Sequence, residues 1–189
     1  MVAVEAGPHI FTMLLENLDR NRVTNVRAVM KAVAAERGIV CLYSGGAGNL
    51  GASTIVRSGG SVAVARVEAD RLEEIITADE LAVARIVKLD LEGAEVPPLL
   101  GLLGLVDNLR EDFETIVELS PERWLAGQPS ANEIIAAFEA KGFHAYDLQT
   151  CYSPEPYVKR IPVRLPRRIR HSVTRQTDIV FSRNDAEQL

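Results

Sequence analysis

Apolar and polar residues follow two rhythms along this chain of 189 residues. Short runs rich in β-branched residues predict buried strands; they cover residues 1–4, 23–33, 84–91, 115–119, 143–148 and 178–181. Stretches with apolar residues at helical spacing predict helices; they cover residues 9–20, 70–78, 95–103 and 130–141. The alternation of strands and helices predicts an α/β fold that contains parallel strands.

Start signals support several of these helices. Ser130 and Glu133 have the spacing of a capping box, and Asp70 is expected to act as the N-cap of the helix over residues 70–78. Pro97 and Pro98 fall in the first turn of the helix at residues 95–103, where proline is tolerated.

Residues 38–67 break the alternation and predict a β-excursion, either a hairpin or a meander. Within it, residues 46–51 read GAGNLG and match the spacing of a dinucleotide-binding loop after a strand. Such a loop requires a helix directly after it, whereas residues 52–60 are β-branched and contain glycines. A flexible turn is therefore the favoured interpretation, and a glycine-rich cofactor loop is the alternative.

Composition and charge narrow the class of protein. The chain is 47% hydrophobic and 25% charged with a net charge of -5, which fits one globular domain over residues 1–189 and gives no electrostatic case for nucleic acid. Cys41 and Cys151 do not indicate a disulfide framework. No apolar run approaches the roughly 20 residues that cross a membrane, and no secretion signal is visible, so a cytoplasmic protein without a membrane partner is expected.

The segment at residues 156–177 carries a local positive charge of +7, since it has no acidic residue. Its basic residues are Lys159, Arg160, Arg164, Arg167, Arg168, Arg170 and Arg175. A solvated loop is the favoured interpretation, and a lid or anchor for an anionic partner is the alternative.

Residues 86–95 read IVKLDLEGAE, a buried strand followed by an acidic turn and glycine. This stretch resembles the signature of the FkbM family of methyltransferases. Weaker similarities occur in the same order at residues 4–8, 15–21, 32–38, 49–53, 117–118 and 178–181. The resemblance therefore spans nearly the whole chain. It implies a class I methyltransferase (Rossmann-like) sheet, mostly parallel, with a final antiparallel strand.

The resemblance also implies S-adenosylmethionine as cofactor, bound over the carboxyl ends of the strands. Glu5, at the end of the family's second strand, is expected to accept hydrogen bonds from the ribose hydroxyls. Ala32 is expected near the adenine, and Asn49 near the cofactor or substrate. The expected reaction is O-methylation of a hydroxyl on a small molecule or sugar.

Three acidic residues are the expected catalytic residues: Asp90, Glu92 and Glu95. A carboxylate can orient the acceptor hydroxyl or accept its proton. In an extended strand, Asp90 and Glu92 would project to the same side. Two alternatives stay open: the acids bind a divalent cation, although no metal is expected, or they cap the next helix, which is the favoured role for Glu95.

The matched segments start at the family's second strand, so its first strand and glycine-rich cofactor loop are expected to be missing. In that family the first strand lies between the second and the fourth, and a gap is therefore expected at the centre of the sheet. A truncated or degenerate methyltransferase-fold module, acting only through binding or with a partner, is the alternative function. The oligomeric state is not predicted.

Overall fold

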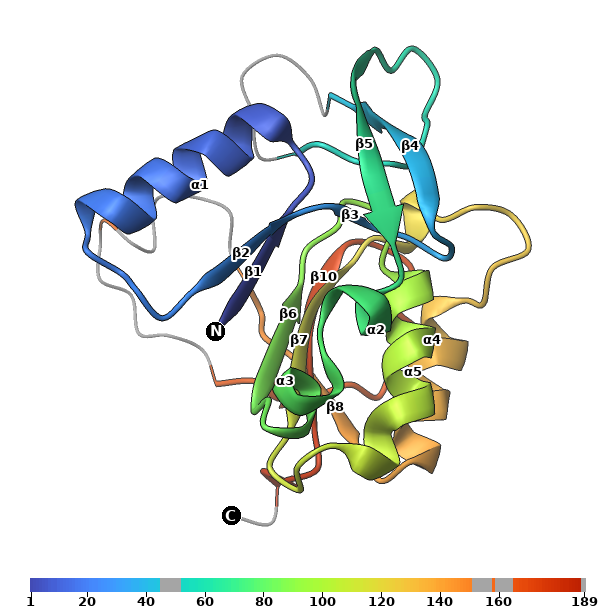
Figure 1. The fold of residues 1–189 in the computed structure, drawn as a ribbon. Helices are drawn as coiled ribbons and strands as arrows, with labels where there is room; N and C mark the ends of the chain where they lie inside the picture. Colours follow the sequence, from blue (N-terminus) through green and yellow to red (C-terminus); the bar gives the residue numbers. More distant parts are fainter. Residues whose placement is uncertain (45–51, 151–157, 159–164, 188–189) are drawn as a thin grey trace.

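The computed structural model describes residues 1–44, 52–150, 158 and 165–187 (Figure 1). Within these residues the chain has an α/β fold with three sheets, which together contain both parallel and antiparallel strands. No helix in this part of the chain is long and apolar enough to cross a membrane.

The largest sheet has the strand order β6–β7–β10–β8–β9. Its strands are Ile86–Leu89 (β6), Glu114–Leu119 (β7), His144–Asp147 (β8), Arg167–Arg168 (β9) and Thr177–Ser182 (β10). β6 and β7 are parallel, whereas β10 lies between β7 and β8 and is antiparallel to both. The expectation of a final antiparallel strand is confirmed.

Two neighbouring helices, α4 (Val96–Leu105) and α5 (Ala131–Ala140), pack beside this sheet (Figure 1). Apolar side chains fill the space between the helices and the sheet. Phe138 of α5 stacks on Phe181 of β10 at 4.2 Å between ring centroids, and all of its surface is buried. The capping box of Ser130 and Glu133 is present at the start of α5, as the sequence predicted.

The amino-terminal residues form a separate strand–helix–strand unit. β1 (Val2–Glu5) pairs in parallel with β2 (Arg27–Met30), and α1 (Pro8–Arg20) connects them. Arg27 links this unit to the rest of the molecule, because its guanidinium donates to both carboxylate oxygens of Glu80, at 2.8 and 2.6 Å, and to the carbonyl of Ile75 at 3.0 Å.

The third sheet has the order β3–β5–β4 and contains Ala32–Val33 (β3), Gly38–Tyr43 (β4) and Ala63–Asp70 (β5). β4 and β5 are antiparallel, so the predicted β-excursion is confirmed, whereas β3 and β5 are parallel. This sheet adjoins the carboxyl ends of β1 and β6 (Figure 1).

The helix predicted over residues 70–78 is wrong. β5 continues to Asp70, which pairs with Val33 and binds Lys31, so Asp70 is not an N-cap. The helical turns that follow are α2 (Leu72–Ile75) and α3 (Ala78–Ala82). They are separate because Thr77 is extended and begins α3 with a capping box of its own.

The α/β fold with mixed sheets that contain parallel strands is confirmed, but the described strands form three sheets and not one. Antiparallel pairs join β10 to β7 and β8, β4 to β5, and β8 to β9. The sheets are separate because no described strand is hydrogen-bonded to both β1 and β6. Two 3₁₀ turns, η1 (Val106–Asn108) and η2 (Pro121–Arg123), complete the described elements.

Candidate functional site

A cavity of about 610 Å³ lies between β1 and β6. One wall is formed by residues of β1 and the other by residues of β6, and residues of α2, α3 and the third sheet close it. Its volume falls within the range of roughly 300–1,000 Å³ that is typical of small-molecule sites. The cavity lies between the two strands where the sequence analysis expected a gap.

Three of the expected site residues line this cavity together: Glu5, Ala32 and Asp90. Glu5 is the last residue of β1, Ala32 begins β3, and Asp90 directly follows β6. They come from distant parts of the chain. Glu5 and Ala32 lie close together because each lies at the carboxyl end of one of the parallel strands β1 and β2, and Asp90 follows the carboxyl end of β6.

Glu5 is held by the start of α1. Its Oε1 accepts a hydrogen bond from the backbone N–H of Gly7 at 2.5 Å. A Cβ at Gly7 would lie 3.0 Å from the same oxygen, so glycine allows this close approach. The contact fixes one carboxylate oxygen and orients the half-buried side chain at the cavity wall.

Asp90 lies outside the strand that was expected to carry it, because β6 ends at Leu89. Its Oδ2 accepts a hydrogen bond from Lys88 Nζ at 2.7 Å, and its side chain is 43% exposed. The argument from strand alternation therefore does not apply to Asp90 and Glu92. Glu92 has a φ of 51°, and the resulting turn brings carboxylate oxygens of Asp90, Glu92 and Glu118 within 4.8 Å of one another.

Glu92 does not line the cavity wall that Asp90 lines. Its carboxylate forms an ion pair with Arg123 of η2. The acidic group of Asp90, Glu92 and Glu118 differs from the predicted trio, since Glu118 replaces Glu95. Exposed acidic groups of this kind are common without an ion, and nothing further in the described residues indicates a metal.

Glu95 is fully buried and is bound inside the protein. Its Oε1 accepts from the N–H of Gly93 at 2.6 Å and its Oε2 accepts from Trp124 Nε1 at 2.7 Å. Burial raises the pKa of this carboxyl, because the charged form loses solvation, although these hydrogen bonds oppose the shift. The role of Glu95 is thus structural but is not the expected helix cap: Glu95 lies at the N-cap position of α4 without a side-chain capping hydrogen bond, and it joins the turn after β6 to the segment after β7.

Several residues that the sequence did not single out also line the cavity. They include Lys31, whose Nζ lies 3.1 Å from Asp70 Oδ2, and Glu80, which binds Arg27. The hydrogen bond from Lys31 lowers the pKa of Asp70. In the sequence, the one sign that Lys31 lies at the cavity was its position directly before the expected site residue Ala32.

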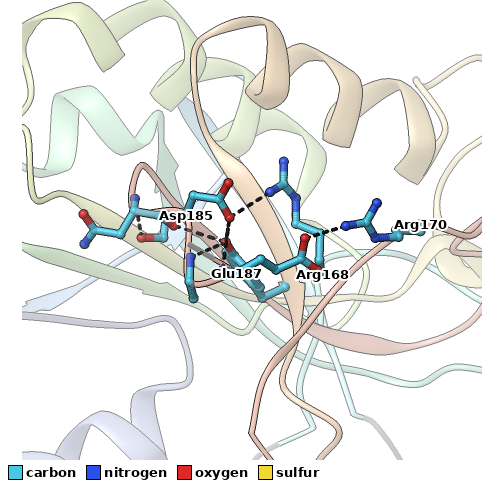
Figure 2. A network of polar contacts seen from close by, with 8 residues as sticks. Arg168, Arg170, Asp185 and Glu187 are labelled. Atoms are coloured by element: carbon cyan, nitrogen blue, oxygen red, sulfur yellow. Dashed lines mark hydrogen bonds and ion pairs between the residues drawn. The ribbon is translucent and has the colours of Figure 1, made fainter. Parts of the chain in front are cut away.

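Two expectations concern residues that the structure does not describe in full. Asn49 and the glycine-rich stretch at 46–51 lie outside the described residues, as does much of the basic segment at 156–177. In its described part, Arg168 and Arg170 bind the acids of the C-terminal segment: Arg168 pairs with Asp185 at 3.2 Å and Arg170 pairs with Glu187 (Figure 2). These two arginines thus hold the C-terminal segment against β9.

Comparisons of the chain with protein-family models, with curated proteins and with solved structures find no match.

Proposed function

We propose that this chain is an S-adenosylmethionine-dependent methyltransferase domain that resembles the FkbM family and methylates a hydroxyl group of a small molecule or sugar. The observation that carries the proposal is the meeting of Glu5, Ala32 and Asp90 at one cavity of about 610 Å³. The sequence resemblance had assigned ribose, adenine and acceptor contacts to these three residues. A cytoplasmic location belongs to the same proposal.

The described residues fit this cofactor. Glu5 presents a carboxylate that can accept from two vicinal hydroxyls, and Gly7 orients it. Ala32 lines the cavity with a small apolar side chain, a kind of surface that suits contact with a flat ring. When bound, the cofactor supplies a sulfonium methyl group whose transfer leaves a neutral thioether.

Asp90 is the residue that would act on the acceptor. Its carboxylate orients the hydroxyl and accepts the proton that the oxygen loses during methylation. The ammonium group of Lys88, 2.7 Å from Oδ2, holds the carboxylate in position through a charge-assisted hydrogen bond. Glu92 and Glu95 take supporting roles, because one is paired with Arg123 and the other is buried.

The first test is calorimetric titration of the chain with S-adenosylhomocysteine. We expect one-site binding that weakens by about tenfold to a hundredfold in Glu5→Gln, since loss of a charged hydrogen-bond acceptor costs roughly 1.5–3 kcal/mol. Glu16→Gln is the matched control, because Glu16 lies on α1 outside the cavity and pairs with Arg20. Equal affinities for the two variants would contradict the role of Glu5.

A second candidate is a methyltransferase-fold module without catalysis. The observation that favours it is the engagement of Glu92 and Glu95 within the protein, which leaves Asp90 as the one expected catalytic acid at the cavity. Binding of S-adenosylhomocysteine, together with no methyl transfer from S-adenosylmethionine to any hydroxyl acceptor, would favour this candidate. Absence of binding by folded protein would exclude both.

A further inference from the structure

The turn that carries Asp90 has two different sides. Asp90, Leu91 and Ala94 line the cavity. On the other side the backbone of Gly93 lies against η2, since a Cβ added to Gly93 would be 2.8 Å from Cβ of Arg123. The N–H of Ala94 donates to the carbonyl of Leu91 at 3.2 Å and closes the turn. One side of the turn thus faces the cavity, and the other rests on the segment after β7.

The ion pair of Asp90 with Lys88 contributes little to the position of this turn. The side chain of Lys88 is 62% exposed and that of Asp90 is 43% exposed. Ion pairs in such exposed positions stabilise a structure weakly, because water screens the charges and both side chains lose freedom. The position of Asp90 therefore depends on what holds the rest of the turn.

Glu95 attaches the turn to the interior of the protein. Its side chain is fully buried, and its Oε1 accepts a hydrogen bond from the N–H of Gly93 at 2.6 Å. Its Oε2 accepts from Nε1 of Trp124 at 2.7 Å. A buried carboxylate oxygen without a donor is neither hydrated nor hydrogen-bonded, which is unfavourable. The indole N–H therefore holds the carboxylate that holds the turn.

Trp124 is itself anchored in the core. It directly follows η2, is half-buried and packs against the large cluster of buried apolar side chains. The residue before it, Arg123, forms an ion pair with Glu92, so two consecutive side chains bind two acids of the turn. Of these two contacts, the one made by Trp124 reaches a fully buried partner, Glu95.

From this geometry we infer that Trp124 is a positioning residue of the proposed site: through Glu95, its indole N–H holds the turn that presents Asp90 at the cavity. The inference rests on the proposed function, because it takes Asp90 to face the point where the methyl group is transferred. Trp124 is not among the residues that line the cavity, so it acts without touching cofactor or acceptor.

Isosteric replacement of Trp124 tests the hydrogen bond by itself. The chain contains one tryptophan, so biosynthetic incorporation of benzothienylalanine, in which sulfur replaces the indole N–H, changes this position alone. We expect the amide of Gly93 to exchange at least about tenfold faster in the substituted protein, because its acceptor Glu95 has lost its other donor. NMR-detected hydrogen exchange measures it. Trp124→Phe should act in the same direction, and unchanged exchange in both proteins would overturn the inference.

Two ligands test the effect on Asp90. Sinefungin carries an ammonium group where S-adenosylmethionine carries its transferable methyl group, and S-adenosylhomocysteine carries nothing there. The ratio of the two affinities therefore reports whether a carboxylate faces this point. We expect the wild type to prefer sinefungin by about tenfold, and both Asp90→Asn and the benzothienylalanine protein to lose this preference. No preference in the wild type, or an unchanged ratio in the substituted protein, overturns the inference, because general loosening weakens both ligands alike.

Tyr146→Phe is the matched control. It removes another half-buried aromatic hydrogen bond, since the Tyr146 hydroxyl donates to the carbonyl of Asn184 outside the cavity. Exchange of Gly93 and the affinity ratio should both stay at wild-type values in this variant. A loss of the ratio in Tyr146→Phe equal to that in Trp124→Phe would overturn the specific role of Trp124.

A double variant and the wild type complete the test. Trp124→Phe combined with Glu95→Gln should lose no more of the ratio than Glu95→Gln alone, since both changes act on one hydrogen-bonded unit. Additive losses would show that Trp124 acts by another route and overturn the inference. Absence of S-adenosylhomocysteine binding by folded wild type would refute the proposed function, whereas binding with an unchanged ratio in the Trp124 proteins would refute only the positioning role.

Discussion

Glu95 shows how one buried carboxyl can connect two separate loops. Its two oxygens receive the N–H of Gly93 and the indole N–H of Trp124, so the turn after β6 and the segment after β7 share one acceptor. Burial removes water from the charged carboxylate and so raises the pKa of Glu95. A residue in this position contributes to the site by holding Asp90 and Glu92 in place, since both belong to the same turn.

This raised pKa has a consequence for stability. A carboxyl whose pKa is higher in the folded than in the unfolded state stabilises the fold below its unfolded pKa, and that contribution is lost as the pH rises through the folded pKa. We therefore expect the free energy of unfolding to fall as the pH rises above about 4.3, the ordinary pKa of glutamate, and Glu95→Gln to flatten this fall. Urea unfolding at a series of pH values measures it. Glu122→Gln, an exposed neighbour, should keep the wild-type slope.

At the scale of elements, the turn between β6 and α4 decides the geometry of the acidic residues. Glu92 and Gly93 both have positive φ, at 51° and 104°. The chain therefore reverses direction immediately after β6 instead of extending. This turn separates Asp90, which reaches the cavity, from Glu92, which reaches Arg123.

Gly93→Ala tests the turn. An added Cβ would lie 2.8 Å from Cβ of Arg123, and the left-handed backbone disfavours alanine, so we expect a loss of about 1–3 kcal/mol of stability. Gly127→Ala separates the two causes, because Gly127 has a φ of 88° with no atom near its added Cβ. Thermal and urea unfolding of both variants measure the difference. An equal loss in the two would show that contact with Arg123 contributes nothing.

At the scale of the whole molecule, the strand–helix–strand unit at the amino terminus is connected to the remaining body across the cavity. The bidentate pair of Arg27 with Glu80 is the best-defined polar link between them. The hydrogen bond from Arg27 and that from the backbone of Thr77 lower the pKa of Glu80 to about 2. None of the residues of α1 is buried, so this unit has little core of its own.

The low pKa of Glu80 predicts acid sensitivity. A carboxyl with a lower pKa in the folded state stabilises the fold above its unfolded pKa, and this contribution is lost as the pH falls toward the folded value of about 2. We expect Glu80→Gln to show a smaller loss of stability than the wild type between about pH 4.3 and pH 2. Glu74→Gln, on the exposed side of α2, is the control. Identical acid unfolding curves for wild type and Glu80→Gln would contradict the link.

Much of the local structure could be predicted from the sequence because it depends on nearby residues. The capping box of Ser130 and Glu133, the amphipathic pattern of α1 and the strand at β6 all rest on preferences that act over a few residues. Asp70 shows the limit. Its residue type favours an N-cap, but pairing with Val33 and the ion pair with Lys31, 39 residues away, keep it in β5. Tertiary contacts outweighed a weak local preference.

The antiparallel course of β10 was expected only from the family resemblance. By itself, the sequence determined the alternation of strands and helices and the order of the acidic turn after β6. These follow from periodicity and turn chemistry, which act over short distances. Only the tertiary structure decided that Glu5, Ala32 and Asp90 share one cavity, that Glu95 is buried against Trp124, and that β1 and β6 face each other with open edges. Such relations depend on how distant elements pack, and burial and hydrogen bonding between them are not encoded in any single stretch of the chain.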